Sequence, residues 1–405
     1  MTELTNMSDQ NNIITQQVSM TTVAISKPKS LDEIHNILQQ HYTRLMSPVA
    51  EGEAMGISKE YDAIDNSSLK LEYSFTTASK RYYRNRYRNI LAPDDTLVPL
   101  WEEFKLGSEL TPSDYINANF VMNRKYILTQ GPMRDCFEHF WSMIFNNINL
   151  DFLFEDNMKE IGKEEEEEET DEQRLVRFNV HREQDADEPV VCVNLTKEVE
   201  DGRIKYDKYF PTNVDEEILY GKYGVKLVSS EDIGKSSRSS GTELPRGSEK
   251  VENRVLDFRR SNAADLVKRV FLVRNTLNDN MKPLKVIHFH YTGWPDGEAP
   301  ENSTDFLEIC EQVNAVKTSK PIVVHCSAGI GRTGTFAFIH STSLLLNKLA
   351  NGGTLETDIT DFPKQILGLR KDRPDLVQTA YQYDFCYRTI LEKLNSLLEI
   401  NSKVI

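Results

Sequence analysis

The sequence predicts an α/β fold of the mixed α+β kind, with a highly twisted mixed β-sheet flanked by helices in a single domain. Short continuous apolar stretches at residues 190–195 and 321–325 are typical of buried strands. Longer segments whose apolar residues recur every three or four positions, such as residues 134–148, are typical of helices that pack on a sheet. The 405 residues are enough for one large domain with extensions or for two ordinary domains.

The elements are expected in the following order. Residues 1–50 are predicted to be a flexible N-terminal extension that contains an amphipathic helix at 30–46, with Ser30 as its N-cap and Glu33 completing a capping box. Further helices are expected at residues 57–64, 134–148, 333–349 and over most of 375–398, and strands at 190–195, 267–273, 284–291 and 321–325.

The domain is expected to span residues 51–398, followed by a tail at 399–405. Two stretches inside it have the composition of surface insertions. Residues 156–187 contain an unbroken acidic run at 164–169, which is typical of a solvated segment. Residues 229–260 are polar, with clustered Ser and Gly, which is typical of a loop.

Composition and charge exclude several classes of protein. The formal net charge of −15 argues against a nucleic-acid partner, because nucleic-acid binders present a basic surface. No apolar run reaches the roughly 20 residues of a membrane helix, and the N-terminus lacks the features of a secretory signal. The five cysteines are scattered and form no CxxC pair. We therefore expect no disulfide framework, no metal, and a reducing location, the cytoplasm or alternatively the nucleus. The protein is also expected to need no cofactor and to act as a monomer.

The segment from His325 to Gly334 carries the strongest chemical signal. It follows a predicted strand, opens a predicted helix and reads His-Cys-Ser-Ala-Gly-Ile-Gly-Arg-Thr-Gly. The small and glycine residues between Cys326 and Arg332 let successive backbone N–H groups converge on one point, which binds an anion. The helix N-terminus adds partial positive charge, and Arg332 can grip two phosphate oxygens with its planar guanidinium. The residues expected to surround the phosphate are Ser327, Ala328, Gly329, Ile330 and Gly331.

Cys326 is the candidate nucleophile of this loop. A helix N-terminus and a nearby cation favour the thiolate form of cysteine, so we expect Cys326 to be ionised and aimed at the bound phosphorus. Thr333 supplies a hydroxyl near the sulfur that can stabilise the leaving thiolate. The alternative is an inert buried cysteine, which is common among free cysteines. The combination of residues at a strand–loop–helix junction argues against that alternative.

This segment resembles the HC-x5-R-[ST] signature of the protein tyrosine phosphatase family, in the form found in its phosphotyrosine-specific, non-receptor branch. The resemblance implies the family's phosphate-binding loop, with His325 as a supporting residue, and a phosphocysteine mechanism. Residues 114–118 and 126–132 are similar to the family's DYINA and YIATQGP segments, which we expect to be structural. The resemblance covers about residues 57–395, in the family's order.

Trp294, Pro295 and Asp296 resemble the family's mobile acid loop, in which the Asp is the general acid. A carboxylic acid on a closing lid can protonate the tyrosyl oxygen as the P–O bond breaks, and the resulting carboxylate can then activate water. Gly297 and Glu298 are transposed relative to the family pattern. Pro-Asp-Gly alone would be a common turn, but beside the Cys326 segment we expect the catalytic role.

Residues 85–89 resemble the family's phosphotyrosine-recognition loop. Tyr87 is expected to form an aromatic wall that makes the pocket deep, so that only phosphotyrosine reaches the thiolate. Asn89 replaces the acidic residue that contacts the substrate main chain. Arg86 and Arg88 are expected to add positive charge to the pocket. The alternative for this segment is an ordinary basic and aromatic surface stretch.

Two further segments complete the predicted site. Glu200 and Lys205 fit the family's acidic residue that orients the loop arginine and its lysine that contacts the acid loop, although lone charges are more often surface residues. Gln378 is expected to position the hydrolytic water with help from Gln382, because a side-chain amide donates and accepts at once. Asp375 stands where some members have a small residue beside a second phosphotyrosine groove, and its bulk and charge argue against such a groove.

Together these motifs predict a metal-free phosphatase that removes phosphate from tyrosine in proteins and counteracts kinase signalling. A dual-specificity phosphatase is one alternative, and Tyr87 argues against it. A catalytically dead module that shields phosphotyrosine is another, and the presence of Cys326, Arg332 and Asp296 argues against it. The acidic insertion and the N-terminal tail are expected to dock basic segments of a partner such as a mitogen-activated protein kinase.

Overall fold

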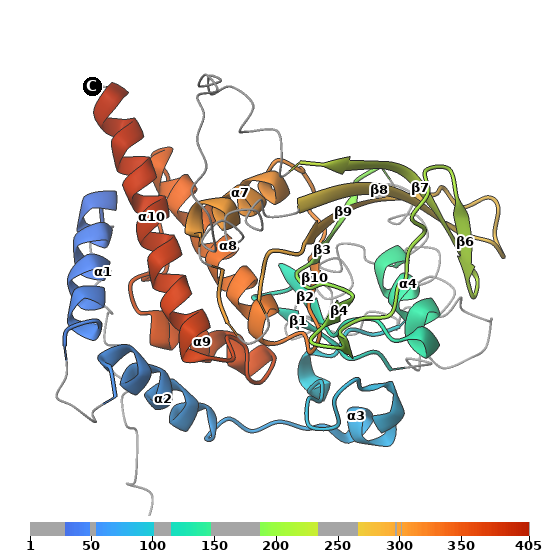
Figure 1. Cartoon of the computed structure of the whole chain (residues 1–405), viewed down its shortest axis with the longest axis horizontal. Helices are drawn as coiled ribbons and strands as arrows, with labels where there is room; N and C mark the ends of the chain where they lie inside the picture. The colour runs from blue at the N-terminus through green and yellow to red at the C-terminus, as the bar shows by residue number, and fades with distance from the viewer. Residues whose placement is uncertain are drawn as a thin grey trace, which may run out of the picture.

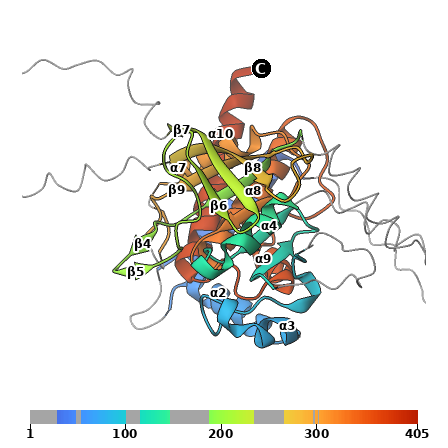
Figure 2. The same ribbon diagram turned by 90° about the vertical axis from the view of Figure 1, so that its right-hand side faces the viewer.

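The structure, a computed structural model, describes residues 29–48, 54–100, 115–146, 187–233, 266–295, 298–300 and 302–404. Its centre is an eight-stranded mixed sheet with the order β1-β2-β10-β3-β9-β8-β7-β6, which confirms the predicted fold class. The strands are β1 (Ala118–Val121), β2 (Tyr126–Thr129), β3 (Val190–Asn194), β6 (Glu217–Tyr220), β7 (Tyr223–Asp232), β8 (Leu266–Asn275), β9 (Leu284–Tyr291) and β10 (Ile322–His325). A separate two-stranded ribbon, β4 (Val199–Glu200) with β5 (Arg203–Ile204), projects from the body of the domain (Figure 2).

Helices lie on both sides of the curved sheet (Figure 1). The described α-helices are α1 (Leu31–Leu45), α2 (Gly56–Ser68), α3 (Thr76–Lys80), α4 (Phe137–Phe145), α7 (Ser303–Asn314), α8 (Gly331–Ala350), α9 (Phe362–Asp372) and α10 (Ala380–Val404). Residues of α7, α8 and α10 form one hydrophobic core with the sheet, and residues of α4 form another. Within the described ranges, no helix is both long and apolar enough to cross a membrane.

Helix α1 forms as its sequence predicts. The Ser30 side chain accepts a hydrogen bond from the backbone N–H of Glu33, and the Glu33 carboxylate accepts one from the backbone N–H of Ser30. This capping box satisfies two of the N–H groups that a helix N-terminus leaves without partners. The helix lies beside α10 (Figure 1) and contributes Leu38, which is fully buried, to the core. Of the predicted N-terminal extension, residues 1–28, 49 and 50 lie outside the described part of the chain.

Several predicted boundaries differ from the structure. The polar insertion was expected to leave the sheet at residue 229, but β7 continues to Asp232 because Ser229–Asp232 pair with β8. The last helix begins at Ala380, not near 375, because Asp375 and Val377 have φ angles of +59° and cannot belong to a right-handed helix. The helix predicted at 134–148 opens with a 3-10 turn and ends at Phe145. The acidic insertion, apart from Asp187, lies outside the described residues.

Four central strands run parallel, and their carboxyl ends meet at one edge of the sheet. In register, His325 of β10 pairs with Thr129 of β2 and with Asn194 of β3, and Asn194 pairs in turn with His290 of β9. Side chains that follow these strands therefore gather at that edge, which is where open α/β sheets place their ligands. The motifs after residues 129, 194, 291 and 325 are brought together in this way.

Candidate active site

The loop after β10 curls around the sulfur of Cys326. Gly329 has a φ of +72°, and its backbone N–H donates to Cys326 Sγ at 3.3 Å. Helix α8 begins at Gly331, so its N-terminus points into the same loop. Both features stabilise negative charge on the sulfur or on an anion bound beside it. Cys326 is buried, with 5% of its surface exposed.

Two glycines allow the loop to pack this closely. A Cβ atom on Gly329 would lie 2.3 Å from the carbonyl oxygen of Thr129, and one on Gly131 would lie 2.4 Å from that of Lys205. The backbone N–H of Gly131 also donates to the carbonyl oxygen of Ser327 at 2.8 Å. The YIATQGP-like segment is thus structural in the way the sequence predicts, because its glycine lets β2 approach the loop.

The structure brings Arg332 and Glu200 together. Arg332 Nη1 donates to Glu200 Oε1 and Arg332 Nη2 to Glu200 Oε2, each at 2.8 Å, and Nη1 also donates to Thr196 Oγ1 at 2.7 Å. Both partners are at least nine-tenths buried in their side chains. A bidentate pair of this kind fixes the plane of the guanidinium at the mouth of the loop. Lys205 lies in the same cluster, with Nζ 3.9 Å from Glu200 Oε2.

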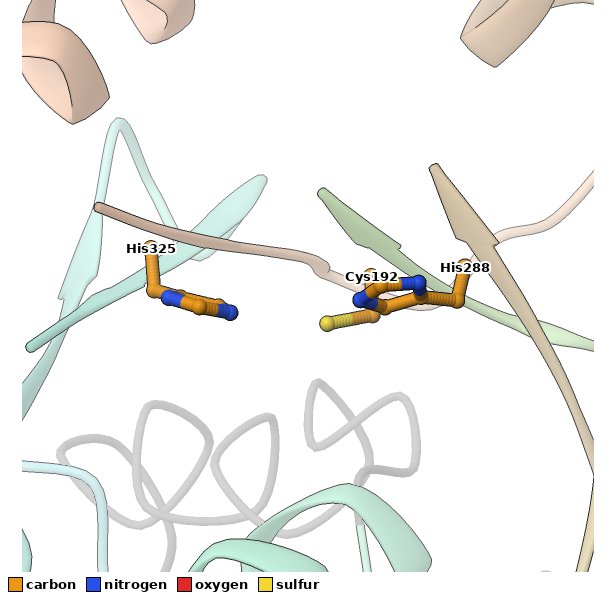
Figure 3. Close-up of side chains that lie close together, drawn as sticks. All are labelled: Cys192, His288 and His325. Carbon is orange, nitrogen blue, oxygen red and sulfur yellow. The ribbon is translucent and has the colours of Figure 1, made fainter. Parts of the chain in front are cut away.

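His325 belongs to a buried network behind the loop. Figure 3 shows Cys192, His288 and His325 pointing toward one another from β3, β9 and β10. The hydroxyl of Tyr209 lies 2.7 Å from His325 Nε2 and 2.9 Å from His288 Nε2. Burial lowers the pKa of His325 to about 3 and raises the pKa of the Cys192 thiol to about 12. These groups are therefore uncharged at neutral pH.

The direction of each hydrogen bond in this network follows from its partners. His325 Nδ1 lies 3.1 Å from the carbonyl oxygen of Cys326, which can only accept, so Nδ1 carries the proton. Nε2 of the neutral ring then accepts from the Tyr209 hydroxyl, and that hydroxyl oxygen accepts from His288 Nε2. His288 Nδ1 is left without a proton, and it is a buried atom with no hydrogen-bond partner among the described residues.

The same cluster has the residue types of a metal site. The ligand atoms of Cys192, His288 and His325 lie within 4.8 Å of one another. However, the Nε2 atoms of both histidines are directed at the Tyr209 hydroxyl, and an ion bound between them would have to displace it. We therefore assign this cluster to hydrogen bonding that orients His325, and through it the Cys326 carbonyl.

Tyr87 reaches the loop from the recognition segment. Its hydroxyl lies 2.8 Å from Ser327 Oγ, and Ser327 Oγ donates to the carbonyl oxygen of Lys205 at 3.0 Å. Tyr87 is half-buried and Asn89 is exposed beside it. Thr333 Oγ1 is buried and has no hydrogen-bond partner among the described residues, so its hydroxyl is available to the loop.

Arg86 does not supply pocket charge in the way the sequence analysis expected. Its guanidinium pairs with Asp207 at 2.8 Å and donates to the carbonyl oxygens of Gly131 and Pro132. The carboxylate of Asp207 neutralises it, so Arg86 instead anchors the recognition segment to the YIATQGP-like segment. Arg88 is exposed.

The two glutamines stand over the start of α8. A Cβ atom on Gly331 would lie 2.9 Å from Gln382 Nε2 and 3.1 Å from Gln378 Oε1. The backbone N–H of Gln378 donates to Gln382 Oε1 at 2.9 Å, which ties the two residues together. Val377 precedes Gln378 with a φ of +59°, a strained conformation for a β-branched residue. Hydrogen bonds from Tyr61 and Arg370 to the Val377 carbonyl oxygen stabilise this conformation, which places Gln378 beside the start of α8.

The acid loop is described only in part. Trp294 is buried, its Nε1 donates to the carbonyl oxygen of Glu298 at 2.8 Å, and its ring packs edge-on against Phe306. This hydrogen bond joins the described residues on the two sides of the predicted general acid. Asp296 and Gly297 lie outside the described residues.

Arg373 is a site residue that the sequence analysis missed. Its side chain is fully buried, and it donates to the carbonyl oxygens of Gly329 and Ala328 at 2.8 and 3.2 Å. It also donates to Asn119 Oδ1 and Asn117 Oδ1 at 2.6 and 2.7 Å. By turning these carbonyls outward, Arg373 leaves the N–H groups of the loop facing inward. The sequence signal for a special role was its position next to Pro374, where a helix is expected to end. An arginine in a charged segment, however, is usually interpreted as a surface residue.

The fold and this loop define a class of protein: an α/β domain that presents a cysteine, an arginine and inward N–H groups at the ends of parallel strands. The sequence matches the family model described as protein-tyrosine phosphatase at residues 81–154 and 186–392. The chain therefore belongs to the protein-tyrosine phosphatase family. The residues left unmatched between these two ranges coincide with the predicted acidic insertion.

Relatives come from several organisms. The chain is 33% identical over 297 residues to tyrosine-protein phosphatase 2 of Dictyostelium discoideum, covering 72% of this chain. It is 29% identical to receptor-type tyrosine-protein phosphatase zeta of Rattus norvegicus over 90% of this chain. It is 25% identical to tyrosine-protein phosphatase non-receptor type 20 of Mus musculus over 88%. The chain spans 58%, 13% and 64% of the lengths of these relatives, respectively.

Proposed function

We propose that this chain hydrolyses phosphotyrosine in proteins through a phosphocysteine at Cys326. The observation that carries the proposal is the pairing of two features in one loop. The Gly329 N–H donates to the Cys326 sulfur, and Arg332 is held beside it by a bidentate bond to Glu200. A thiolate nucleophile and a fixed cation are what attack on a phosphate dianion requires.

In the first step, the sulfur of Cys326 attacks phosphorus and the bond from phosphorus to the tyrosyl oxygen breaks. The loop N–H groups and Arg332 stabilise the charge on the phosphoryl oxygens in the transition state. Asp296 donates its proton to the departing tyrosyl oxygen, so that tyrosine leaves as a neutral phenol.

In the second step, water attacks the phosphorus of phosphocysteine and the P–S bond breaks. Gln378 holds the water with the help of Gln382, and the Asp296 carboxylate takes the proton of the water. The Cys326 thiolate is released, and the Gly329 N–H and the Thr333 hydroxyl stabilise it. The cycle ends with inorganic phosphate and the enzyme in its starting protonation state.

Specificity for phosphotyrosine, as in the non-receptor branch, is supported by Tyr87. Its hydroxyl contacts Ser327, so its ring lies along the approach to the Cys326 loop. A wall of this size keeps the short side chain of phosphoserine or phosphothreonine from reaching the sulfur. A Tyr87→Ala variant is expected to hydrolyse a phosphotyrosine peptide more slowly than the wild type. If the wild type hydrolysed phosphotyrosine and phosphothreonine peptides at comparable rates, it would be a dual-specificity enzyme.

Replacement of the nucleophile tests the chemistry directly. Cys326→Ser is expected to abolish turnover of a phosphotyrosine peptide and still bind it, because the loop N–H groups and Arg332 remain. Wild-type rates in Cys326→Ser would disprove the mechanism. A burst of p-nitrophenol from p-nitrophenyl phosphate by the wild type would separate the enzyme from a dead binding module, which would release none.

We also propose a cytoplasmic location, with the nucleus as the alternative, and action as a monomer against kinase signalling. The location is supported by five cysteines that are free and buried in the structure. The acidic insertion is proposed to dock a basic segment of a mitogen-activated protein kinase. Deletion of residues 156–187 is expected to abolish capture of such a kinase by Asp296→Ala protein. Unchanged capture would remove the docking role.

A further inference from the structure

A cavity of about 470 Å³ opens beside the Cys326 loop, where the sequence argued against a groove. It shares Gln378 with the active site, because Gln378 both lines the cavity and stands over Gly331. The remaining lining comes from α2, the segment after it, and the segment between α9 and α10: Tyr61, Asp65, Asn66, Ser68, Leu69, Leu71, Tyr73, Arg370, Pro374 and Asp375. A peptide bound with its phosphotyrosine at Cys326 has this cavity next to it.

Arg370 is the only cation among these lining residues, and it has no donor left for a ligand. A guanidinium has five N–H groups. Arg370 Nε donates to the Leu376 carbonyl oxygen, Nη1 to Asp65 and Ser68, and Nη2 to Tyr61 and the Val377 carbonyl oxygen, at 2.6 to 3.1 Å. Its side chain is 2% exposed. The cavity therefore has no free guanidinium N–H groups among its lining residues that could bind a second phosphate group.

The remaining ionic group of the cavity is the Asp375 carboxylate. Asp65 is already paired with Arg370 at 2.6 Å, so the two charges compensate each other. Asp375 is exposed, and its side chain makes no hydrogen bond or ion pair within the part of the chain that the structure describes. Its backbone has a φ of +59°, which holds it on the turn that leads into Gln378. The three ionised lining residues thus carry a net charge of −1, and no lining cation pairs with Asp375. The nearby guanidinium of Arg373 interacts with this carboxylate electrostatically, but it is fully buried and does not line the cavity.

We infer that this cavity selects substrates that carry a lysine or arginine side chain within about three residues of the phosphotyrosine, since three extended residues span about 10 Å. The inference rests on the proposed function. The cationic end of that side chain pairs with Asp375, and its methylene groups lie against Leu69, Leu71 and Tyr73. A phosphate or carboxylate at the same place is repelled.

A set of phosphotyrosine peptides tests this inference. Each peptide carries Arg, Gln, Glu or a second phosphotyrosine at one position from three before to three after the phosphotyrosine. At one or two positions, kcat/KM of the wild type is expected to be about fivefold higher for Arg than for Gln, the size of an exposed ion pair. It should be lower again for Glu and for phosphotyrosine. The ratio should shrink as salt screens the pair.

Asp375→Asn is the matched variant, because Asn tolerates the left-handed backbone and removes only the charge. Its Arg-to-Gln ratio is expected to fall below twofold, with unchanged kcat on p-nitrophenyl phosphate, which has no flanking residues. Glu356→Gln, an exposed change of equal charge outside the cavity, should keep the wild-type ratio.

Three results would overturn the inference: no Arg preference in the wild type, a preference that persists in Asp375→Asn, or a preference for a second phosphotyrosine. In each case hydrolysis of the Gln peptide would leave the proposed function standing. Absence of hydrolysis of every peptide and of p-nitrophenyl phosphate would instead refute the proposed function, and the inference with it.

Discussion

Arg373 lies behind the Cys326 loop, and its four described hydrogen bonds all go to neutral oxygens. Burial lowers the pKa of its guanidinium to about 10, so it remains a cation at neutral pH. Two of its bonds shape the loop, and two fasten the loop to Asn117 and Asn119 of the DYINA-like region. The geometry of the Cys326 loop therefore depends on a buried residue that lies outside the loop.

Arg373→Lys tests this positioning role. Lysine keeps the charge but cannot hold the loop carbonyls and the two asparagines at once. Loss of hydrogen bonds from a buried charged group should lower the free energy of unfolding by about 3 kcal/mol. We expect kcat/KM on a phosphotyrosine peptide to fall at least tenfold, measured at a temperature where the variant is folded.

Arg388→Lys is the control for that experiment. Arg388 is partly exposed and pairs with Asp384 one helical turn away, so the change should alter stability by less than about 1 kcal/mol. If Arg373→Lys matched the control in both stability and kcat/KM, Arg373 would have no part in shaping the loop.

Among the elements, α1 differs most from its predicted place. The sequence analysis assigned it to a flexible extension, but Leu31, Ile34 and Leu38 are buried in the core that contains α8 and α10. Tyr42 adds a hydrogen bond to Asp384 of α10 at 2.8 Å, and stacks on Tyr387. The helix thus stabilises the long helix that begins just after the Gln378 turn.

Leu38→Ala measures that contribution. Removal of a fully buried leucine side chain should cost about 2–5 kcal/mol in the free energy of unfolding. Chemical denaturation followed by tryptophan fluorescence gives this value. Gln40→Ala, on the exposed face of the same helix, should cost less than about 0.5 kcal/mol. Equal effects of the two changes would mean that α1 does not pack as described.

At the scale of the whole molecule, buried histidines couple stability to pH. Burial lowers the pKa of His290 and of His340 to about 4, and that of His325 to about 3. In the unfolded chain a histidine has a pKa of about 6.5. Between these pH values the unfolded state binds more protons than the folded state. The contribution of these histidines to the free energy of unfolding is therefore complete above pH 6.5 and is lost as the pH falls toward 4.

Urea unfolding at pH 7 and pH 5 checks this dependence. Each such histidine should lower the free energy of unfolding by roughly 2 kcal/mol from pH 7 to pH 5. The urea concentration at the wild-type unfolding midpoint should therefore be lower at pH 5. His340 lies outside the Cys326 loop, in the middle of α8, and its Nδ1 lies 2.7 Å from the Tyr126 hydroxyl, so His340→Gln is the suitable variant. In this variant, the free energy of unfolding should change between pH 7 and pH 5 by roughly 2 kcal/mol less than it does in the wild type. An unchanged difference would rule out His340 as a source.

The sequence alone determined the parts of the molecule that depend on neighbours along the chain. The capping box of α1 joins residues three positions apart, and the Cys326 loop lies within one short run between a strand and a helix. Glycine and cap residues restrict the backbone locally, so their pattern predicts the local structure directly. The fold class followed from the same apolar patterns.

Tertiary structure alone decided which distant charges meet. Arg332 and Glu200 are 132 residues apart, and Arg370 meets Asp65 across 305 residues. The sequence alone suggests that Arg370 and Arg373 are surface charges, because exposed arginines are the rule. Only packing of the segments against each other buries them, and burial requires each N–H group to find an acceptor. That requirement, which acts across the whole fold, shapes the loop and occupies the N–H groups of Arg370 beside it.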